Sequence, residues 1–182
     1  GITGLTPEDE PTPQALAEIA DFVTANDVKT IYFETLVSPA IADCELSFIG
    51  RDPINVAMAH LQHIDYVDLL NKLGAKVIEL PAEPSLPDSV FVEDTVLLFD
   101  ELAVMTRPGA ASRRGEVASI EAAFRKYREV IAHITEPGTL DGGDVLRIGK
   151  QVFVGLSKRS NQAAIDQLTD ILKPYGYSVT AV

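Results

Sequence analysis

The sequence predicts an α/β fold in which a unit of two strands, a helix and a third strand occurs about three times, after a helix and a strand near the N-terminus. Two observations support this. The runs "TVLLFDELAVMTR" and "DVLRIGKQVFVGLS" each hold two short apolar strands around a polar turn, and a helix and another strand follow each run. Val96 and Val145, the equivalent valines of the two runs, are 49 positions apart, which indicates a repeat.

The first 34 residues predict a helix and then a strand. Residues 1–27 combine an acidic, Pro-rich loop with a helix that has Thr12 as its N-cap and Pro13 as its first residue. The string "VKTIYFE" (28–34) is typical of a strand.

A second helix is predicted over 53–73, where apolar residues recur at helical spacing. Gly74 ends this helix, and "KVIEL" (76–80) is the next strand. The segment 28–80 is therefore interpreted as a looser first copy of the unit. The apolar residues of the helix are Ala57, Leu61, Ile64, Val67 and Leu70.

The two complete units have the same predicted order of elements, with short turns between their first two strands. In the first unit an Asp-Glu turn precedes a helix over 112–127 and a strand over 130–134. In the second unit a Gly-Lys turn precedes a helix over 161–172 and a strand over 177–182.

Composition narrows the function classes. The formal net charge of −12 argues against nucleic acid and anionic membranes as partners and suits a small cationic ligand. No apolar run approaches the roughly 18 residues of a membrane span, and no secretory signal is recognised. No Gly-rich phosphate loop is recognised either, and no cofactor is expected. The single cysteine, Cys44, favours a reducing, cytoplasmic location.

The stretch "PDSVFVEDT" combines carboxylates with the apolar residues Val90 and Val92, which predict a buried strand. Glu93 and Asp141 are 48 positions apart, and each precedes the first strand pair of its unit. Units arranged around an axis would bring such positions to one cavity. Converging carboxylates match a planar guanidinium through paired hydrogen bonds. The candidate carboxylates are Asp88, Glu93, Asp94 and Asp141, with Phe91 as an apolar wall.

Arg113 and Arg159, 46 positions apart near the starts of the two helices, would suit the α-carboxylate of an amino acid. Simpler interpretations stay open from the residues alone. The carboxylates would then end a strand in solvent, "SRR" would be surface charge, and "TLDGGD" would be a turn whose glycines permit positive φ. His60-x-x-His63, His133 and Cys44 form no recognisable metal or nucleophile pattern, so no metal site is predicted.

Four motifs follow one another along the chain: "LPDSVFVEDT", "TRPGAASRRGEV", "GTLDGGDVL" and "VFVGLSKRSN". Together they resemble the dimethylarginine dimethylaminohydrolases, guanidino-modifying enzymes of the pentein superfamily. The resemblance covers residues 37–182 and implies part of a five-bladed pentein propeller, of which this chain supplies about three blades. It also implies hydrolysis of methylated arginine to citrulline and a methylamine.

The same resemblance implies roles for the candidate residues. Asp88, Glu93 and Asp94 would hold the substrate guanidinium with Phe91 against it, and Arg113 and Arg159 would organise the amino-acid end. Asp141 would be the acidic member of the catalytic set. The catalytic histidine and the nucleophilic cysteine of the resembled family match no residue of 1–182, so this chain alone is expected to be inactive.

Residues 1–42 instead resemble a segment of the metal-binding solute receptors of ABC transporters, in which the equivalent of Glu34 can be a metal ligand. A junction near 36–42 is therefore predicted, with one segment over 1–36, a partial pentein domain over 37–182, and a chimeric or truncated chain as the simplest account. Two other functions stay open. One is a non-catalytic binding or assembly module that pairs with a second chain through open sheet edges, and the other is a fragment of a metal-binding receptor.

Overall fold

The computed structural model describes residues 30–34 and 55–182 of the chain. The chain forms two compact units, of residues 1–90 and 91–182. The predicted helix within residues 1–27 and the single cysteine, Cys44, lie outside the described residues.

The described part of the first unit is a strand, a helix and a second strand. Strand β1 (Thr30–Glu34) runs parallel to β2 (Lys76–Leu80), and helix α2 (Val56–Lys72) connects them in sequence and packs on β2. The Asn55 side chain caps α2 by accepting a hydrogen bond from the Met58 N–H at 3.1 Å. Gly74 ends the helix with a φ of +89°, as predicted.

The buried stripe of α2 differs from the predicted one. Val67 and Leu70 are buried with His63, whereas Leu61 and Ile64 are exposed. The predicted and the observed stripes share Val67 and Leu70, in the last two turns of the helix. Apolar residues occur there on both sides of the boundary between buried and exposed surface. The first turns diverge because a histidine, which the prediction left out, takes the buried position. Burial lowers the pKa of His63, so that its imidazole is favoured in the neutral form.

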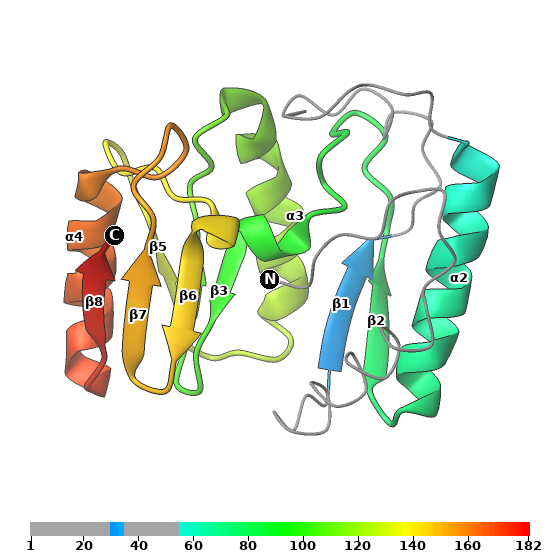
Figure 1. The fold of residues 1–182 in the computed structure, drawn as a ribbon, viewed down its shortest axis with the longest axis horizontal. Coiled ribbons are helices and arrows are strands. Elements are labelled where there is room, and N and C mark those ends of the chain that lie inside the picture. Colours follow the sequence, from blue (N-terminus) through cyan, green and yellow to red (C-terminus); the bar gives the residue numbers. More distant parts are fainter. Residues whose placement is uncertain (1–29, 35–54) are drawn as a thin grey trace. The chain divides into compact units, whose positions relative to one another are not determined.

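The second unit contains two consecutive copies of the strand–strand–helix–strand order, as predicted (Figure 1). The first copy has β3 (Val96–Leu98), β4 (Ala103–Met105), α3 (Glu116–Phe124) and β5 (Ile131–His133), and the second has β6 (Val145–Ile148), β7 (Gln151–Val154), α4 (Gln162–Leu172) and β8 (Ser178–Ala181).

The two copies form sheets with the same topology. In each sheet the first two strands are antiparallel, and the second strand pairs in parallel with the third. Val96 pairs with Met105 in the first sheet, and Val145 pairs with Val154 at the equivalent place in the second. The parallel pair β1 and β2 corresponds to the second and third strands of such a sheet. The predicted repeat is therefore confirmed for the second unit.

Two predicted elements differ from the structure. The helix predicted over 112–127 is divided into the 3₁₀ turn η3 (Ala111–Gly115) and the shorter α3. The strand predicted at Val90 and Val92 is absent among the described residues, because 87–90 form turns and η2 (Val92–Asp94) is a 3₁₀ turn. Another 3₁₀ turn, η4 (Gly142–Asp144), precedes β6 just as η2 precedes β3.

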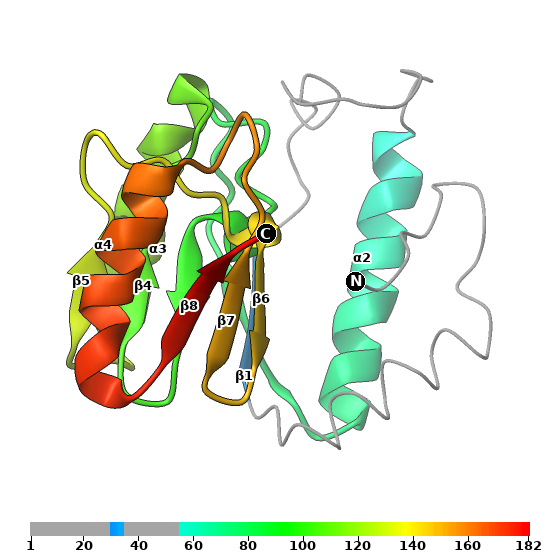
Figure 2. The same ribbon diagram turned by 60° about the vertical axis from the view of Figure 1, so that its left-hand side comes forward.

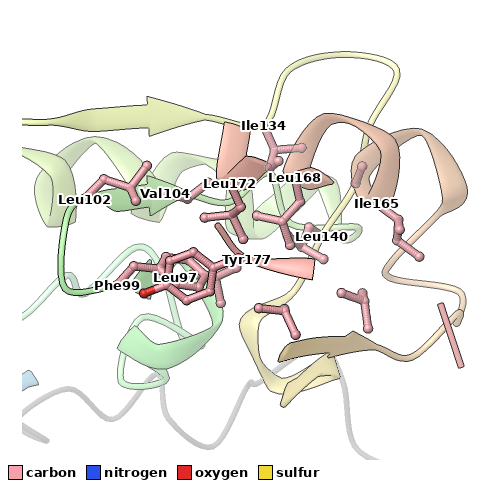
Figure 3. Packing of buried hydrophobic residues seen from close by; sticks show 13 residues of the cluster. Leu97, Phe99, Leu102, Val104, Ile134, Leu140, Ile165, Leu168, Leu172 and Tyr177 are labelled. Carbon is pink, nitrogen blue, oxygen red and sulfur yellow. The ribbon is translucent and has the colours of Figure 1, made fainter. Parts of the chain in front are cut away.

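A single apolar core joins the two copies of the second unit (Figure 3). Helix α4 packs along β8, and its residues Leu168 and Leu172 are fully buried (Figure 2). Phe99 meets Tyr177 edge to face with ring centroids 5.0 Å apart. The core also contains Leu97, Leu102, Val104, Ile134, Leu140, Val152, Val154, Ala164 and Ile165. It thereby fixes η2 and η4, which begin the two copies, in one rigid frame.

Candidate functional site

The 3₁₀ turns η2 and η4 of the second unit meet at their backbones. The Gly143 N–H donates to Asp94 Oδ1 at 2.9 Å. A Cβ on Gly142 would lie 1.9 Å from the carbonyl oxygen of Glu93, so only glycine fits at this position. The glycines of "TLDGGD" were predicted to allow positive φ, but neither has one. Their actual role is to permit this close approach, because the two turns have no room for side chains between them.

Arg113 is buried and fully committed to partners within the unit. Its Nη1 donates to Asp94 Oδ2 at 2.6 Å, and Nη2 donates to Glu116 Oε2 at 2.8 Å and to the Phe91 carbonyl oxygen at 3.3 Å. The guanidinium also lies 5.8 Å from the centre of the Phe91 ring. Burial alone would lower the pKa of Arg113, but the bonds to the two carboxylates raise it. The charged form is thus held in place.

Asp141 is fully buried, and its two carboxyl oxygens differ in their surroundings. Oδ1 accepts a hydrogen bond from the Gly109 N–H at 3.0 Å. Oδ2 has no hydrogen-bond partner among the described residues, and Arg159 Nε lies 3.8 Å from it. Burial raises the pKa of Asp141, and the negative charge of Asp94 adds to the rise. A buried carboxyl oxygen without a donor is costly and is typical of functional sites.

Arg159 lies in the loop before α4 and is paired with Asp144. Its Nη2 donates to Asp144 Oδ1 at 2.8 Å, while Oδ2 of Asp144 accepts from the hydroxyls of Ser157 at 2.8 Å and Ser160 at 2.7 Å. The Ser160 hydroxyl also accepts the Asp141 N–H at 3.1 Å. Burial opposes ionisation of Asp144, but the hydrogen bonds from the two serines and Arg159 lower its pKa.

The remaining candidates lie on and before η2. The side chains of Phe91 and Glu93 are exposed. Although Glu93 is exposed as a residue, the surrounding protein displaces part of the water near its carboxyl group and so raises its pKa, and the charge of the adjacent Asp94 adds to this. Asp88 is buried in the turn at the end of the first unit.

The structure therefore brings together several of the predicted residues in the second unit. Asp94 contacts Arg113, and Arg159 lies near Asp141, while the η2–η4 contact joins the two pairs. Sequence reasoning missed Glu116 and Ser160 as parts of this network. Glu116 follows Arg113 by three positions at the start of a helix, which is a visible signal for a pair. Ser160 has no such signal, because its partners are 16 and 19 positions away.

Other candidates for chemistry remain outside this network. Within the described part of the chain, no three His, Cys, Asp or Glu side chains form a group that could hold a metal ion. His133 Nε2 lies 3.0 Å from Glu121 Oε2 on an exposed surface. None of the described helices has the length and hydropathy needed to cross a membrane.

Comparison with known proteins now assigns the family. Residues 83–177, which include both 3₁₀ turns and both arginines of the site, match the family model of arginine deiminase. The chain belongs to the arginine deiminase family. Residues 1–73 match a second model, that of the periplasmic component A of a zinc-uptake complex.

Individual relatives within this family agree with that assignment. An N(G),N(G)-dimethylarginine dimethylaminohydrolase from Streptomyces coelicolor is 41% identical over 145 residues, which are 80% of this chain and 56% of the relative. The solved structure of a mutant of the Pseudomonas aeruginosa enzyme, complexed with citrulline, superposes with a TM-score of 0.80 at 35% identity. That superposition covers 85% of this chain and 60% of the other. The fold is thus a partial pentein-like fold, and the chain spans little more than half the length of these relatives.

The N-terminal resemblance also has a relative of its own. The high-affinity zinc uptake protein ZnuA of Bacillus subtilis is 41% identical over 49 residues, which are 27% of this chain and 15% of the relative. Both resemblances found in the sequence are therefore present in the one chain.

Proposed function

We propose that this chain is a dimethylarginine dimethylaminohydrolase-like domain that recognises an arginine-like guanidino amino acid and does not hydrolyse it alone. The observation that supports recognition is the network on η2 and η4, in which Asp94 and Asp141 are held within one frame with Arg113 and Arg159. Fixed carboxylates suit a guanidinium, and guanidinium groups suit the α-carboxylate of the same ligand.

In this proposal Asp88, Glu93 and Asp94 hold the guanidinium of the ligand, and Phe91 lies against it. Arg159 organises the amino-acid end directly, whereas Arg113, whose guanidinium is buried and already hydrogen bonded, acts on the ligand only through the groups that it holds. Because Arg113 is itself hydrogen bonded to Asp94 Oδ2, it also fixes one of the carboxylates that receive the guanidinium. Asp141 supplies the acidic member of the catalytic set, and its Oδ2 suits a donor that the described residues do not provide.

The proposed lack of turnover follows from the residues within 1–182. The family resemblance implies a catalytic histidine and a cysteine thiolate, and neither is matched by a residue within 1–182. Hydrolysis would then require groups supplied by another segment or another chain, which the open edges of the small sheets would suit. The junction near 36–42, with a receptor-like segment before it and the partial pentein domain after it, belongs to the same proposal.

Calorimetric titration with arginine, methylated arginine and citrulline tests recognition directly. We expect Asp94→Asn to abolish binding of the two cationic ligands, whereas Asp100→Asn, on an exposed ion pair with Arg147, should leave it unchanged. Equal affinities in both variants and in the unmodified chain would refute recognition at this site. A citrulline-release assay with dimethylarginine should detect no turnover, and turnover that is lost in Asp141→Asn would refute the inactivity.

The pH dependence of binding follows from the raised pKa values of Asp141 and Glu93. The ionised carboxylates attract a guanidinium, so affinity for arginine should fall as the pH decreases through these raised values. Below the pKa of a carboxylate that must be ionised for binding, the affinity for arginine falls by up to about tenfold for each pH unit. Citrulline, which has no positive charge on its ureido group, should lose little affinity over the same range. Parallel losses for both ligands would contradict the role of these carboxylates.

The zinc-uptake match of residues 1–73 favours a second candidate function, which is metal binding by the N-terminal segment. A thermal-shift scan with Zn²⁺, Mn²⁺ and arginine separates the two functions, since a ligand that binds only the folded state raises its stability. Stabilisation by arginine and not by either metal supports the guanidino proposal.

A further inference from the structure

Two carboxylates compete for the guanidinium of Arg159. Asp144 Oδ1 receives a hydrogen bond from Nη2 at 2.8 Å, whereas Asp141 Oδ2 is 3.8 Å from Nε, beyond hydrogen-bonding distance. Asp141 Oδ2 is nevertheless buried without a hydrogen-bond partner among the described residues. A carboxylate this close to an arginine would gain a charged hydrogen bond from a small rotation of the guanidinium. The pairing with Asp144 opposes that rotation.

Asp144 is itself firmly fixed. The hydroxyls of Ser157 and Ser160 donate to its Oδ2 at 2.8 and 2.7 Å, so Oδ1 is directed toward Arg159. The Ser157 hydroxyl accepts the N–H groups of Arg159 and Ser160 at 2.9 and 3.1 Å, which holds the loop around it. Gly109 confines the Arg159 backbone, since a Cβ on Gly109 would lie 2.5 Å from the Arg159 Cα. The position of the guanidinium therefore depends mainly on Asp144.

We propose that Asp144 is a positioning residue that holds the Arg159 guanidinium away from the Asp141 carboxylate and so keeps Asp141 Oδ2 open to an outside donor. The Ser160 hydroxyl links the two acids, because it donates to Asp144 and accepts the Asp141 N–H at 3.1 Å. Asp144 thus fixes both the arginine and the backbone of the acid that the arginine would otherwise neutralise. This inference rests on the proposed function only for the roles of Asp141 and Arg159 in binding and catalysis.

The titration of the Asp141 carboxyl reports directly on this arrangement. The charged groups that face Asp141 are Asp94, Arg113 and Arg159. Asp144→Asn should let Arg159 move onto Asp141 Oδ2, and such a pair should lower the pKa of Asp141 by about one pH unit or more. Carboxyl ¹³C NMR of the full 182-residue chain, without ligand, measures this value.

Removing the charge of Asp144 would also lower the pKa of Asp141 through space, so a double-variant cycle is required. In an Arg159→Gln background, a simple charge effect persists, whereas an effect that acts through Arg159 disappears. We expect most of the effect on the pKa of Asp141 to disappear, with only the through-space part left, and we expect the original pKa to return in Asp144→Glu. Asp100→Asn, which removes one carboxylate of the same unit from an exposed pair, should change nothing. Persistence of the full effect without Arg159 would overturn the proposal.

A second measurement needs no variant. The Nη–H signals of Arg159 should change mainly with the titration of Asp144, below its ordinary pKa of 3.8, and less with that of Asp141, which lies only near Nε. Signals that follow Asp141 instead would overturn the proposal even if Asp144→Asn does not fold. Neither measurement uses a guanidino ligand, so failure of the proposed function would leave both results interpretable.

Discussion

Replacement of Gly142 by alanine should force apart the two turns on which the site is built. The new Cβ would lie 1.9 Å from the Glu93 carbonyl oxygen and 3.3 Å from the Asp94 Cα. Both are backbone atoms, so relief requires η2 and η4 to separate by roughly 1.5 Å to reach ordinary contact. Gly142 does not have a positive φ, and the strain would therefore come from this contact.

The magnitude can be worked from what such a separation breaks. The hydrogen bond from the Gly143 N–H to Asp94 Oδ1 would be lost, and bonds to charged groups contribute about 1.5–3 kcal/mol. Forced overpacking adds about 1–3 kcal/mol. We therefore expect Gly142→Ala to lower the free energy of unfolding by about 2.5–6 kcal/mol.

Urea denaturation followed by circular dichroism measures this loss, and the chain offers a matched control. A Cβ on Gly155 would meet only the Asp144 carbonyl oxygen at 3.7 Å, which is an ordinary contact. Gly155→Ala should leave the stability unchanged or raise it by about 0.4–1 kcal/mol, through the unfolded chain. Equal effects of the two substitutions, or a loss below about 1 kcal/mol in Gly142→Ala, would refute the steric reasoning.

Three further changes separate buried from exposed charge. Glu116→Gln should lower the free energy of unfolding by about 3–5 kcal/mol in the same denaturation assay, because Arg113 stays buried with fewer charged partners; a negligible loss would contradict this. Lys150→Met, at the exposed pair with Glu101, should leave the urea midpoint nearly unchanged, and a large decrease would be contrary evidence. Asp144 has a lowered pKa, so it stabilises the fold above its ordinary pKa of 3.8 and loses this effect as the pH falls further. The stability difference between the unmodified chain and Asp144→Asn should therefore shrink at acid pH. A constant difference between pH 7 and pH 3 would exclude this stabilising role of the Asp144 charge.

Local patterns predicted the strands well and one helix face poorly. The pairs β3–β4 and β6–β7 were predictable because short apolar runs flank turns, and Gly149 has the positive φ that such a turn favours. The stripe of α2 was not, because apolar side chains occur on more than one side of this helix. Sequence alone does not show which side of the helix the rest of the unit covers. In the structure the buried side is the one that contains His63.

The site was predictable as a list of charges but not as a network. Carboxylates before strands and arginines before helices followed from the repeat, and the structure places Asp94 against Arg113 accordingly. The choice between partners depends on small differences in distance, such as the pairing of Arg159 with Asp144 at 2.8 Å rather than with Asp141 at 3.8 Å. Such choices arise from tertiary packing, which no spacing rule contains.

The site exists because the two copies of the repeat differ at equivalent positions. Glu93 and Asp94 stand 49 positions before Gly142 and Gly143, so one turn carries two carboxylates where its counterpart carries no side chain. The absence of side chains at Gly142 and Gly143 lets the backbone of η4 approach η2, and the Gly143 N–H then donates to the Asp94 carboxylate that the first copy presents. Two identical turns could not make this contact, since side chains on both would collide. The copies thus differ where the site is assembled, while the strand pairing that holds the turns in register is kept.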